Sequence, residues 1–439
     1  MRILGIGDYA DLGSIYIRLA REGHDVRVFI AEEESRDVLA GLIHRIDDWQ
    51  AALPWIREAG PDGLILFEEV GRGALQDELR RDGYHVVGGS ALGDRIEQER
   101  AYGQHVLGDL GLRTLRSHAF ETFDEALAFV GANPTRYVLK FNGSMFSSEM
   151  NYVGARDDGA DVAAVLRRHR RTWDEDWDDP PSFILMEHVR GIETGLGAFF
   201  DGEQFVGPVN LDWEHKRFFA GDLGELTGEM GTVLTYRGAD ALFDATLAHL
   251  VPRLRAAKHV GYINLNTIIN ADGIWPLEFT CRFGYPGFAI LSALFAEPVG
   301  PMLGRIARAG GGAIATHDGF AVGIVLTVPP FPYHHGYEDL SKGMPIVMPE
   351  LRDDELDHVH LGEVARIDGE LVTAGQVGFV MVVTGRGPTI EDAQHEAYAL
   401  AQRISIPNVR YRNDIGDGLR AGALAELARL GWFDPNSSR

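Results

Sequence analysis

Four polar side chains alternate with apolar ones along residues 263–280, on either side of an Asp-Gly dipeptide. They are Asn264, Asn266, Glu278 and Thr280. Alternation around such a turn predicts two antiparallel strands that carry these side chains on one face. Carboxylate, amide and hydroxyl oxygens suit Mg²⁺ or Mn²⁺, with phosphate and water oxygens completing the shell. Glu278, Asn266 and Thr280 are therefore the predicted metal ligands, and a partly polar sheet face is the alternative.

Several cationic residues stand where they could meet the phosphates of a nucleotide. Lys140 closes a short apolar run and precedes a loop rich in glycine and serine, in which Ser147 lies. A lysine at the end of a strand can reach phosphate oxygens while loop amides cover them, so both residues are predicted to bind phosphate. Arg282 follows the second strand and could hold a carboxylate or a transferring phosphoryl group. Lys216, in a basic tripeptide, is a second catalytic candidate, with a surface cluster as the alternative.

The segment 184–193 is typical of a strand that leads into a turn, with Glu187 and Glu193 six residues apart. Backbone groups at such a hinge can pair with the edge of an adenine. The Glu193 carboxylate can accept hydrogen bonds from ribose hydroxyls. The alternative is a solvated hairpin.

Several α/β units must hold these residues. Over the first ninety or so residues strands alternate with helices, which predicts a parallel, doubly wound sheet, followed by a helix at 95–110. A smaller unit of helices and strands begins at about residue 119, with an acidic loop expected at 172–181. Long strands and a helix at 240–257 fill the next region, and further strands and helices follow a glycine-rich linker candidate at 309–315.

A glycine turn after the first strand raises the alternative of a nicotinamide-dependent oxidoreductase. Gly5, Gly7 and Gly13 lie in this turn, but their spacing is not G-x-G-x-x-G. The turn is well predicted, whereas its ligand is not.

The bulk properties exclude several classes of protein. The chain has 439 residues, 45% of them apolar, and one cysteine, which fits a reducing, cytoplasmic compartment. A formal net charge of −24 argues against a nucleic-acid partner, because phosphate backbones attract clustered lysine and arginine. No apolar run approaches the roughly 18 residues of a membrane span, so we expect no membrane association.

The order of the motifs resembles the ATP-grasp superfamily, and most closely the phosphoribosylamine–glycine ligase (glycinamide ribonucleotide synthetase) family. The resemblance is carried by 138–140, 186–193, 212–217, 227–231, 277–284, 377–380 and 411–416. It implies an α/β ATP-grasp fold with an N-terminal doubly wound domain like that of biotin carboxylase and a C-terminal α+β domain. The implied domains are 1–94 at the N-terminus, 95–118 with 189–315 as the central ATP-grasp domain, 119–188 as the small lid domain, and 316–439 at the C-terminus.

The resemblance also implies roles for particular residues. ATP would lie between the small and central domains, with Lys140, and Arg100 in place of a family lysine, on its phosphates. Glu187 and Val189 would meet the adenine, Glu193 the ribose, and Glu278 the magnesium ion. The family reaction phosphorylates the carboxylate of glycine, and the amine of phosphoribosylamine then displaces phosphate.

Four departures from the family pattern affect mainly the substrate side. They are the N-terminal turn at 8–13, the loop at 144–149, Thr280 in place of an asparagine, and the tripeptide 285–287. These departures favour an ADP-forming carboxylate–amine ligase with an altered amine and with glycine or another amino acid as the carboxylate. The alternatives are the true phosphoribosylamine–glycine ligase of purine synthesis and a nucleotide-binding protein without catalysis. We expect a monomer or a homodimer.

Overall fold

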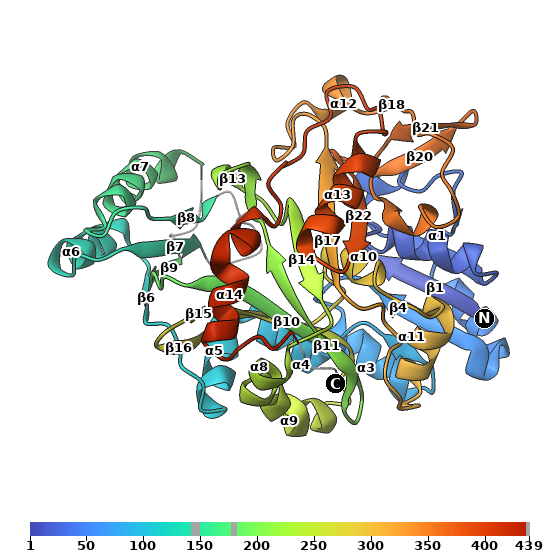
Figure 1. Cartoon of the computed structure of the whole chain (residues 1–439), viewed down its shortest axis with the longest axis horizontal. Coiled ribbons are helices and arrows are strands. Elements are labelled where there is room, and N and C mark those ends of the chain that lie inside the picture. Colours follow the sequence, from blue (N-terminus) through green and yellow to red (C-terminus); the bar gives the residue numbers. More distant parts are fainter. Residues whose placement is uncertain (142–149, 177–181, 436–439) are drawn as a thin grey trace.

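The computed structural model describes residues 1–141, 150–176 and 182–435. Figure 1 shows a large body of sheets and helices, with a smaller unit built from α6, α7 and β6–β9 standing to one side of it. Every helix within these described ranges is too short or too polar to cross a lipid bilayer.

The N-terminal sheet is parallel and doubly wound, as the alternation of strands and helices predicts. Its strand order is β3-β2-β1-β4-β5. The strands are β1 (Arg2–Gly7), β2 (Asp25–Ile30), β3 (His44–Arg45), β4 (Gly63–Phe67) and β5 (Val86–Val87). Ile3 packs with α1 (Gly13–Arg21) on one face, while Leu4 packs with α2 (Leu53–Glu58) and α3 (Gly73–Arg81) on the other. Burial on both faces explains why the central strands β1 and β4 are almost continuously apolar.

The smaller unit has its own sheet and its own core. Its strand order is β6-β9-β7-β8. Its elements are β6 (Ser117–Phe120), β7 (Tyr137–Phe141), β8 (Tyr152–Val153), β9 (Phe183–Glu187), α6 (Phe123–Ala132) and α7 (Ala160–Asp176). The core is aromatic: the rings of Phe141 and Trp173 stack at 5.5 Å and those of Phe123 and Phe183 at 5.2 Å.

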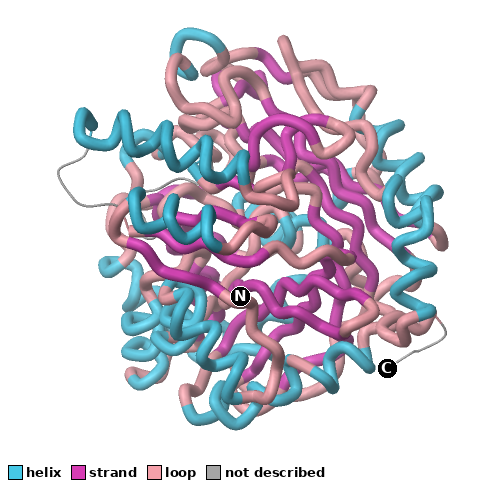
Figure 2. Tube along the Cα trace, turned by 90° about the vertical axis from the view of Figure 1, so that its left-hand side faces the viewer, coloured by secondary structure: helices cyan, strands magenta, loops and turns pink. Residues whose placement is uncertain are grey.

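An antiparallel sheet of eight strands forms the centre of the molecule, with the order β16-β15-β10-β11-β14-β17-β22-β19. The strands are β10 (Ile192–Asp201), β11 (Phe205–Glu214), β14 (Gly231–Thr235), β15 (Val260–Asn270), β16 (Gly273–Thr280), β17 (Phe320–Thr327), β19 (Val359–Leu361) and β22 (Phe379–Gly387). Figure 2 shows strands, in magenta, running side by side through the body of the molecule. The sheet therefore continues from the central region into the C-terminal region through the pairing of β14 with β17.

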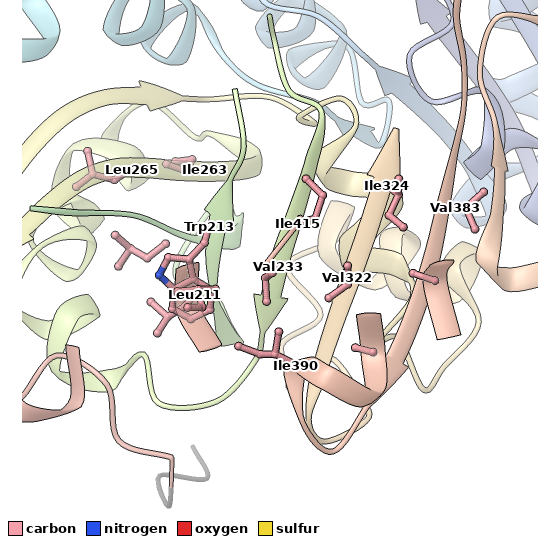
Figure 3. Close-up of a cluster of buried hydrophobic side chains, with 14 of the residues drawn as sticks. Leu211, Trp213, Val233, Ile263, Leu265, Val322, Ile324, Val383, Ile390 and Ile415 are labelled. Carbon is pink, nitrogen blue, oxygen red and sulfur yellow. The ribbon is translucent and has the colours of Figure 1, made fainter. Parts of the chain in front are cut away.

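One face of this sheet is apolar. Leu211, Trp213 and Leu265 pack there with Val233 and with Ile390 of α13 (Ile390–Ala401), as Figure 3 shows. Because side chains alternate along a strand, the residues between them project to the opposite face. That opposite face carries the polar residues of the site.

Shorter elements complete the fold. They are the hairpin of β12 (Arg217–Phe219) and β13 (Leu223–Leu226), the sheet of β18 (Pro345–Ile346), β20 (Val364–Ile367) and β21 (Glu370–Thr373), and the helices α10 (Gly287–Ser292), α11 (Val299–Ala307), α12 (Tyr337–Leu340) and α14 (Leu424–Arg429).

Two helices expected as single elements are broken. The helix predicted at 95–110 is α4 (Ala91–Gln98) and α5 (Arg100–Asp109), separated at Glu99. A Cβ on Gly103 would lie 2.7 Å from the carbonyl oxygen of Ile96, so α5 folds back on α4 where only glycine fits.

The helix predicted at 240–257 is likewise α8 (Asp240–Ala245), a 3₁₀ turn and α9 (Val251–Ala256). Thr246 leaves the helical region at φ −135° and ψ −90°, and a proline in the first turn of α9 suits a helix start. The acidic loop expected at 172–181 is also wrong in its first part, because α7 continues to Asp176.

Candidate active site

Three cations from separate parts of the chain surround the carboxylate of Glu278 on β16. Lys140 Nζ lies 3.5 Å from Glu278 Oε2, Lys216 Nζ lies 3.7 Å from Oε1, and Arg100 Nη2 lies 3.9 Å from Oε2. Lys140, with Lys216 and Arg100, lowers the pKa of Glu278 to about 2. The carboxylate is therefore ionised throughout the neutral range.

Each of these side chains is placed by its element. Lys140 alternates with Leu139 and Phe141 along β7, whose side chains are buried in the aromatic core, so its own side chain leaves by the other face. Arg100 is the first residue of α5, and the break at Glu99 sets its direction. Lys216 lies in the two-residue link between β11, which ends at Glu214, and β12.

The four alternating polar residues share a face, as predicted. Asn264 pairs with Thr280 and Asn266 with Glu278 across β15 and β16. Asn266 donates from Nδ2 to Glu193 Oε1 at 2.8 Å. Its own Oδ1 is buried and has no hydrogen-bond partner among the described residues.

This donor set fits a divalent cation that also binds phosphates. Asn266 offers an unused oxygen next to the Glu278 carboxylate, and the Thr280 hydroxyl lines the same cavity. Within the described ranges no three His, Cys, Asp or Glu side chains form a metal cluster. Mg²⁺ typically takes only one or two carboxylates and completes its shell with phosphate and water oxygens.

Lys216 and Lys140 differ in electrostatic setting. Burial lowers the pKa of Lys216, but Glu214, Glu193 and Glu278 together raise it well above its usual value. Its Nζ lies 3.2 Å from Glu214 Oε2 and 3.3 Å from Glu193 Oε1. Burial lowers the pKa of Lys140, and Glu278 opposes that shift. Lys216 is thus a firmly charged bridge between acids and not part of a surface cluster.

Arg282 lies just beyond β16 and is held by a partner from α4. Its Nε lies 3.2 Å from Glu97 Oε1, and the same carboxylate accepts a hydrogen bond of 2.7 Å from the backbone nitrogen of Cys281. Arg282 lines two cavities, of about 220 and 240 Å³, which lie on either side of Glu278 and Thr280.

The residues predicted to bind adenine and ribose differ in how they relate to this cluster. Glu187 ends β9 and Val189 follows it; both are partly exposed, and neither of these described residues lines the two cavities. Glu193, by contrast, contacts both Asn266 and Lys216. Ser147 lies outside the described residues.

Residues to which the sequence analysis assigned no role extend the larger cavity across the sheet to β11 and β14. They include Asn210, Asp212, Glu229, Thr232 and Tyr262. Asp212 Oδ2 accepts hydrogen bonds from Asn210 Nδ2 at 2.8 Å and Asn264 Nδ2 at 2.7 Å. Burial raises the pKa of Asp212 to about 7. The alternation of Asn210, Asp212 and Glu214 along β11 is the sequence signal that could have identified them.

The N-terminal glycine turn is filled by acidic side chains. A Cβ on Gly7 would lie 2.3 Å from the Glu68 carboxylate, whose Oε1 accepts a hydrogen bond of 2.5 Å from the Tyr16 hydroxyl. Glu69 Oε1 accepts one of 2.7 Å from the backbone nitrogen of Asp8. Such a turn does not favour an anionic pyrophosphate, which argues against the nicotinamide alternative.

Comparison with known proteins agrees with this geometry. Residues 98–288 match the phosphoribosylglycinamide synthetase ATP-grasp (A) domain and residues 321–418 match the phosphoribosylglycinamide synthetase C domain, together more than half of the chain. The chain belongs to the phosphoribosylglycinamide synthetase family. It is an ATP-grasp ligase, of a class that forms C–N bonds. ATP-grasp enzymes use ATP with a divalent metal ion.

Relatives of this ligase match it over nearly its whole length. The phosphoribosylamine–glycine ligase of Corynebacterium ammoniagenes is 25% identical over 446 residues, covering 97% of this chain and 99% of the relative. That of Halalkalibacterium halodurans is 27% identical over 449 residues, with 98% of each chain covered.

Solved structures support the fold. Phosphoribosylamine–glycine ligase from Thermotoga maritima has a TM-score of 0.70 at 23% identity, covering 94% of this chain and 100% of that one. The biotin carboxylase domain of Hydrogenobacter thermophilus 2-oxoglutarate carboxylase, solved with MgADP, has a TM-score of 0.62 at 10% identity, covering 99% and 96%. The ATP-grasp fold expected from the motifs is confirmed.

Proposed function

We propose that this ligase joins a small carboxylic acid to an amine through an acyl phosphate, with conversion of ATP to ADP and phosphate. The observation that carries the proposal is the convergence of Lys140, Lys216 and Arg100 on Glu278. A carboxylate is a poor electrophile because its leaving group would be oxide. Transfer of a phosphoryl group supplies a good leaving group, and clustered cations stabilise the charge that moves during transfer.

The bond changes are balanced as follows. A carboxylate oxygen attacks the γ-phosphorus of ATP, the bond to the bridging oxygen breaks, and ADP leaves. The amine nitrogen then attacks the acyl carbon, phosphate leaves with the C–O bonding pair, and the nitrogen loses one proton.

The chain's own residues would bind and orient these groups. Lys140 and Arg100 hold the phosphates, together with Ser147. Arg282, held in place by Glu97, binds the substrate carboxylate, and Lys216 stabilises the transferring phosphoryl group. A divalent cation, Mg²⁺ or Mn²⁺, held by Glu278, Asn266 and Thr280, would supply further charge neutralisation.

The nucleotide would lie between two parts of the chain. Glu187 and the backbone of Val189 would meet the adenine and Glu193 the ribose. The domains proposed to form this cleft are 119–188 on one side and 95–118 with 189–315 on the other. The remaining domains, 1–94 and 316–439, would contribute the amine side of the site.

Two observations support different amines. The relatives that match nearly the whole chain are named phosphoribosylamine–glycine ligases. Their name supports phosphoribosylamine as the amine and glycine as the carboxylate. An altered amine is supported by the N-terminal turn. There the Arg72 guanidinium is already paired with Asp8, and the buried Glu68 and Glu69 side chains lie close by, so a phosphate group would have to compete with Asp8 for that cation. We favour the altered amine and retain phosphoribosylamine as the second candidate.

The test is ADP release by the purified protein with ATP, Mg²⁺, glycine and either phosphoribosylamine or a panel of other amines. We expect Glu278→Ala to lower turnover by at least about 100-fold, as loss of a group that acts on transition-state charge does. Glu370→Ala, at an exposed position on β21, is the matched control and should retain activity. Normal turnover by Glu278→Ala would contradict the assignment. Stabilisation by ATP without turnover would favour a nucleotide-binding protein without catalysis.

A further inference from the structure

We propose that the carboxylate substrate is longer than glycine and carries a cationic nitrogen at its far end, which lies between Asp212 and Glu229. The inference rests on the proposed function, because it takes the phosphoryl group to be transferred at the Glu278 end of the same cavity. It names the class of carboxylate that this chain selects.

The cavity runs across four neighbouring strands of the sheet, along one row of paired residues. Asp212 on β11 pairs with Gly195 on β10, Gly195 with Asn266 on β15, and Asn266 with Glu278 on β16. Three strand spacings of about 4.8 Å separate the α-carbons of Asp212 and Glu278 by about 14 Å. The nitrogen and carboxylate carbon of glycine are only about 2.5 Å apart. A molecule activated near Glu278 therefore needs a longer chain to reach Asp212.

Two glycines of β10 leave room for side chains of the neighbouring strands to lie over them. A Cβ on Gly195 would lie 2.0 Å from Asp212 Oδ1, and one on Gly197 would lie 2.0 Å from the Tyr262 hydroxyl. No side chain of β10 therefore separates the two ends of the cavity at these positions. Tyr262 donates to Asn210 Oδ1 at 2.9 Å, which fixes the wall beyond.

The far end has carboxyl groups but neutral partners. Both amides that bind Asp212 donate to Oδ2, while Oδ1 lies above Gly195 at the cavity floor. Glu229 is buried and accepts a hydrogen bond from the Thr232 hydroxyl. Two cations of the described residues line this cavity, and both are engaged elsewhere: Lys216 bridges Glu214, Glu193 and Glu278, and Arg282 is paired with Glu97. Two buried carboxyl groups with neutral donors match an incoming ammonium or guanidinium group.

The unused buried oxygen of Asn266 points to a ligand at the other end. Asn266 is 7% exposed and lines the cavity, and its Oδ1 has no hydrogen-bond partner among the described residues. The cavity thus offers a phosphoryl end and a cation-binding end, with no side chain of β10 between them at Gly195 and Gly197. Burial also raises the pKa of Glu229 well above its usual value, Glu214 adds to the shift, and Lys216 opposes it only in part.

The test uses a homologous series of ω-amino acids: glycine, β-alanine, 4-aminobutanoate, 5-aminopentanoate and 6-aminohexanoate. Hydroxylamine replaces the amine, so that any activated carboxylate is trapped as a hydroxamate. We expect kcat/KM to rise from glycine to a longer member of the series by about tenfold or more, the range of a charge-assisted hydrogen bond. Pentanoate and hexanoate, which lack the nitrogen, should be poor substrates. Glycine as the best substrate would overturn the inference.

Two variants locate the effect. Asp212→Asn and Glu229→Gln should each reduce the preference for the ω-amino acid over the uncharged acid, while the Kd for ATP stays unchanged. The matched controls are Asp244→Asn and Glu370→Gln, both at exposed positions away from the cavity. Thermal unfolding checks that each variant folds. An unchanged preference in both variants would contradict the inference.

Calorimetric binding of 6-aminohexanoate and hexanoate separates this inference from the proposed function, because binding needs no turnover. Tighter binding of the amino acid, lost in both variants, with no ADP release from any acid, would support the subsite and contradict the ligase reaction. Turnover of glycine with no preference in binding would support the reaction and contradict the subsite.

Discussion

Glu278 and Glu68 lie near the ends of strands in two different sheets, and their surroundings have opposite electrostatic effects. Glu278 meets Lys140, Lys216 and Arg100, which hold its pKa at about 2. Burial raises the pKa of Glu68 well above the usual value, and Glu69 adds to the shift. The same type of side chain is thus held as an anion among three cations at Glu278, whereas burial favours its protonated form at Glu68. Partners far apart in the chain decide which it becomes.

The largest effect is expected at the cationic side of the comparison. Lys140→Met should lower ATP-dependent turnover by about 100- to 1000-fold, because it removes the cation nearest to Glu278. Steady-state ADP release measures the change. Lys258→Met, at an exposed position between α9 and β15, is the control and should behave as the wild type. Equal losses in both variants would mean that the effect is not specific to the site.

The buried carboxyl of Glu68 should matter for stability. Glu68→Ala removes the partner of the Tyr16 hydroxyl and leaves a void, so we expect a loss of about 2–4 kcal/mol in the free energy of unfolding. Glu68→Gln keeps a neutral acceptor and should cost less than about 1 kcal/mol. Urea unfolding at pH 7 compares the two variants. If the glutamine variant loses as much as the alanine variant, Glu68 is ionised in the folded protein.

The two regions should also respond oppositely to pH. Burial raises the pKa of Glu69 from its usual value of about 4.5 to about 8. The folded protein then holds a proton that the unfolded chain has released, so this contribution to stability is complete below about pH 4.5 and is lost as the pH rises towards 8. Glu278, with its lowered pKa, contributes stability above pH 4.5 that is lost as the pH falls towards 2.

The free energy of unfolding, measured from pH 5 to pH 8, tests the Glu69 term. Titration of Glu69 can lower the free energy of unfolding by at most about 1.4 kcal/mol per pH unit. In Glu69→Gln, the free energy of unfolding should therefore decrease less steeply as the pH rises. Identical slopes for the variant and the wild type would show that Glu69 titrates normally.

The smallest effect is expected at Arg100. Its Nη2 lies 3.9 Å from Glu278, the longest of the three contacts, and another cation of similar reach can replace it. Arg100→Lys should therefore change kcat/KM for ATP by less than about fivefold, corresponding to under about 1 kcal/mol. A loss as large as that of Lys140→Met would mean that the guanidinium makes a specific paired contact with phosphate.

Local periodicity predicted part of the site and could not predict the rest. The alternation of Asn264, Asn266, Glu278 and Thr280 fixes their common face, because a hairpin brings them together over a few residues. The contact between Lys140 and Glu278 joins two sheets and was expected only from the order of the motifs. Nothing local reveals it.

The far end of the cavity was missed for a related reason. Asp212 faces it because Gly195, on the neighbouring strand, has no side chain, and only the pairing of β10 with β11 shows this. Glu68 follows an apolar run and resembles a solvated strand end until α1 brings Tyr16 over it. The break at Glu99 depends on the packing of α5 against α4, which helical periodicity does not reveal. The break at Thr246 has a local signal that the periodicity hid, because Pro252 marks the start of α9.

The separate core of the smaller unit has a mechanical consequence. Its aromatic residues pack with one another. The chain enters the unit at β6 and leaves it at β9, which are neighbours in its sheet, and β7 lies between them in sequence. Lys140 is attached to this unit, whereas Glu278, Asn266 and Lys216 belong to or adjoin the eight-stranded sheet (Figure 1). A rigid rotation of the smaller unit about those two connections would move Lys140 away from Glu278 and leave Lys216 in place. Because Lys140 lowers the pKa of Glu278, that pKa would depend on the angle between the two bodies.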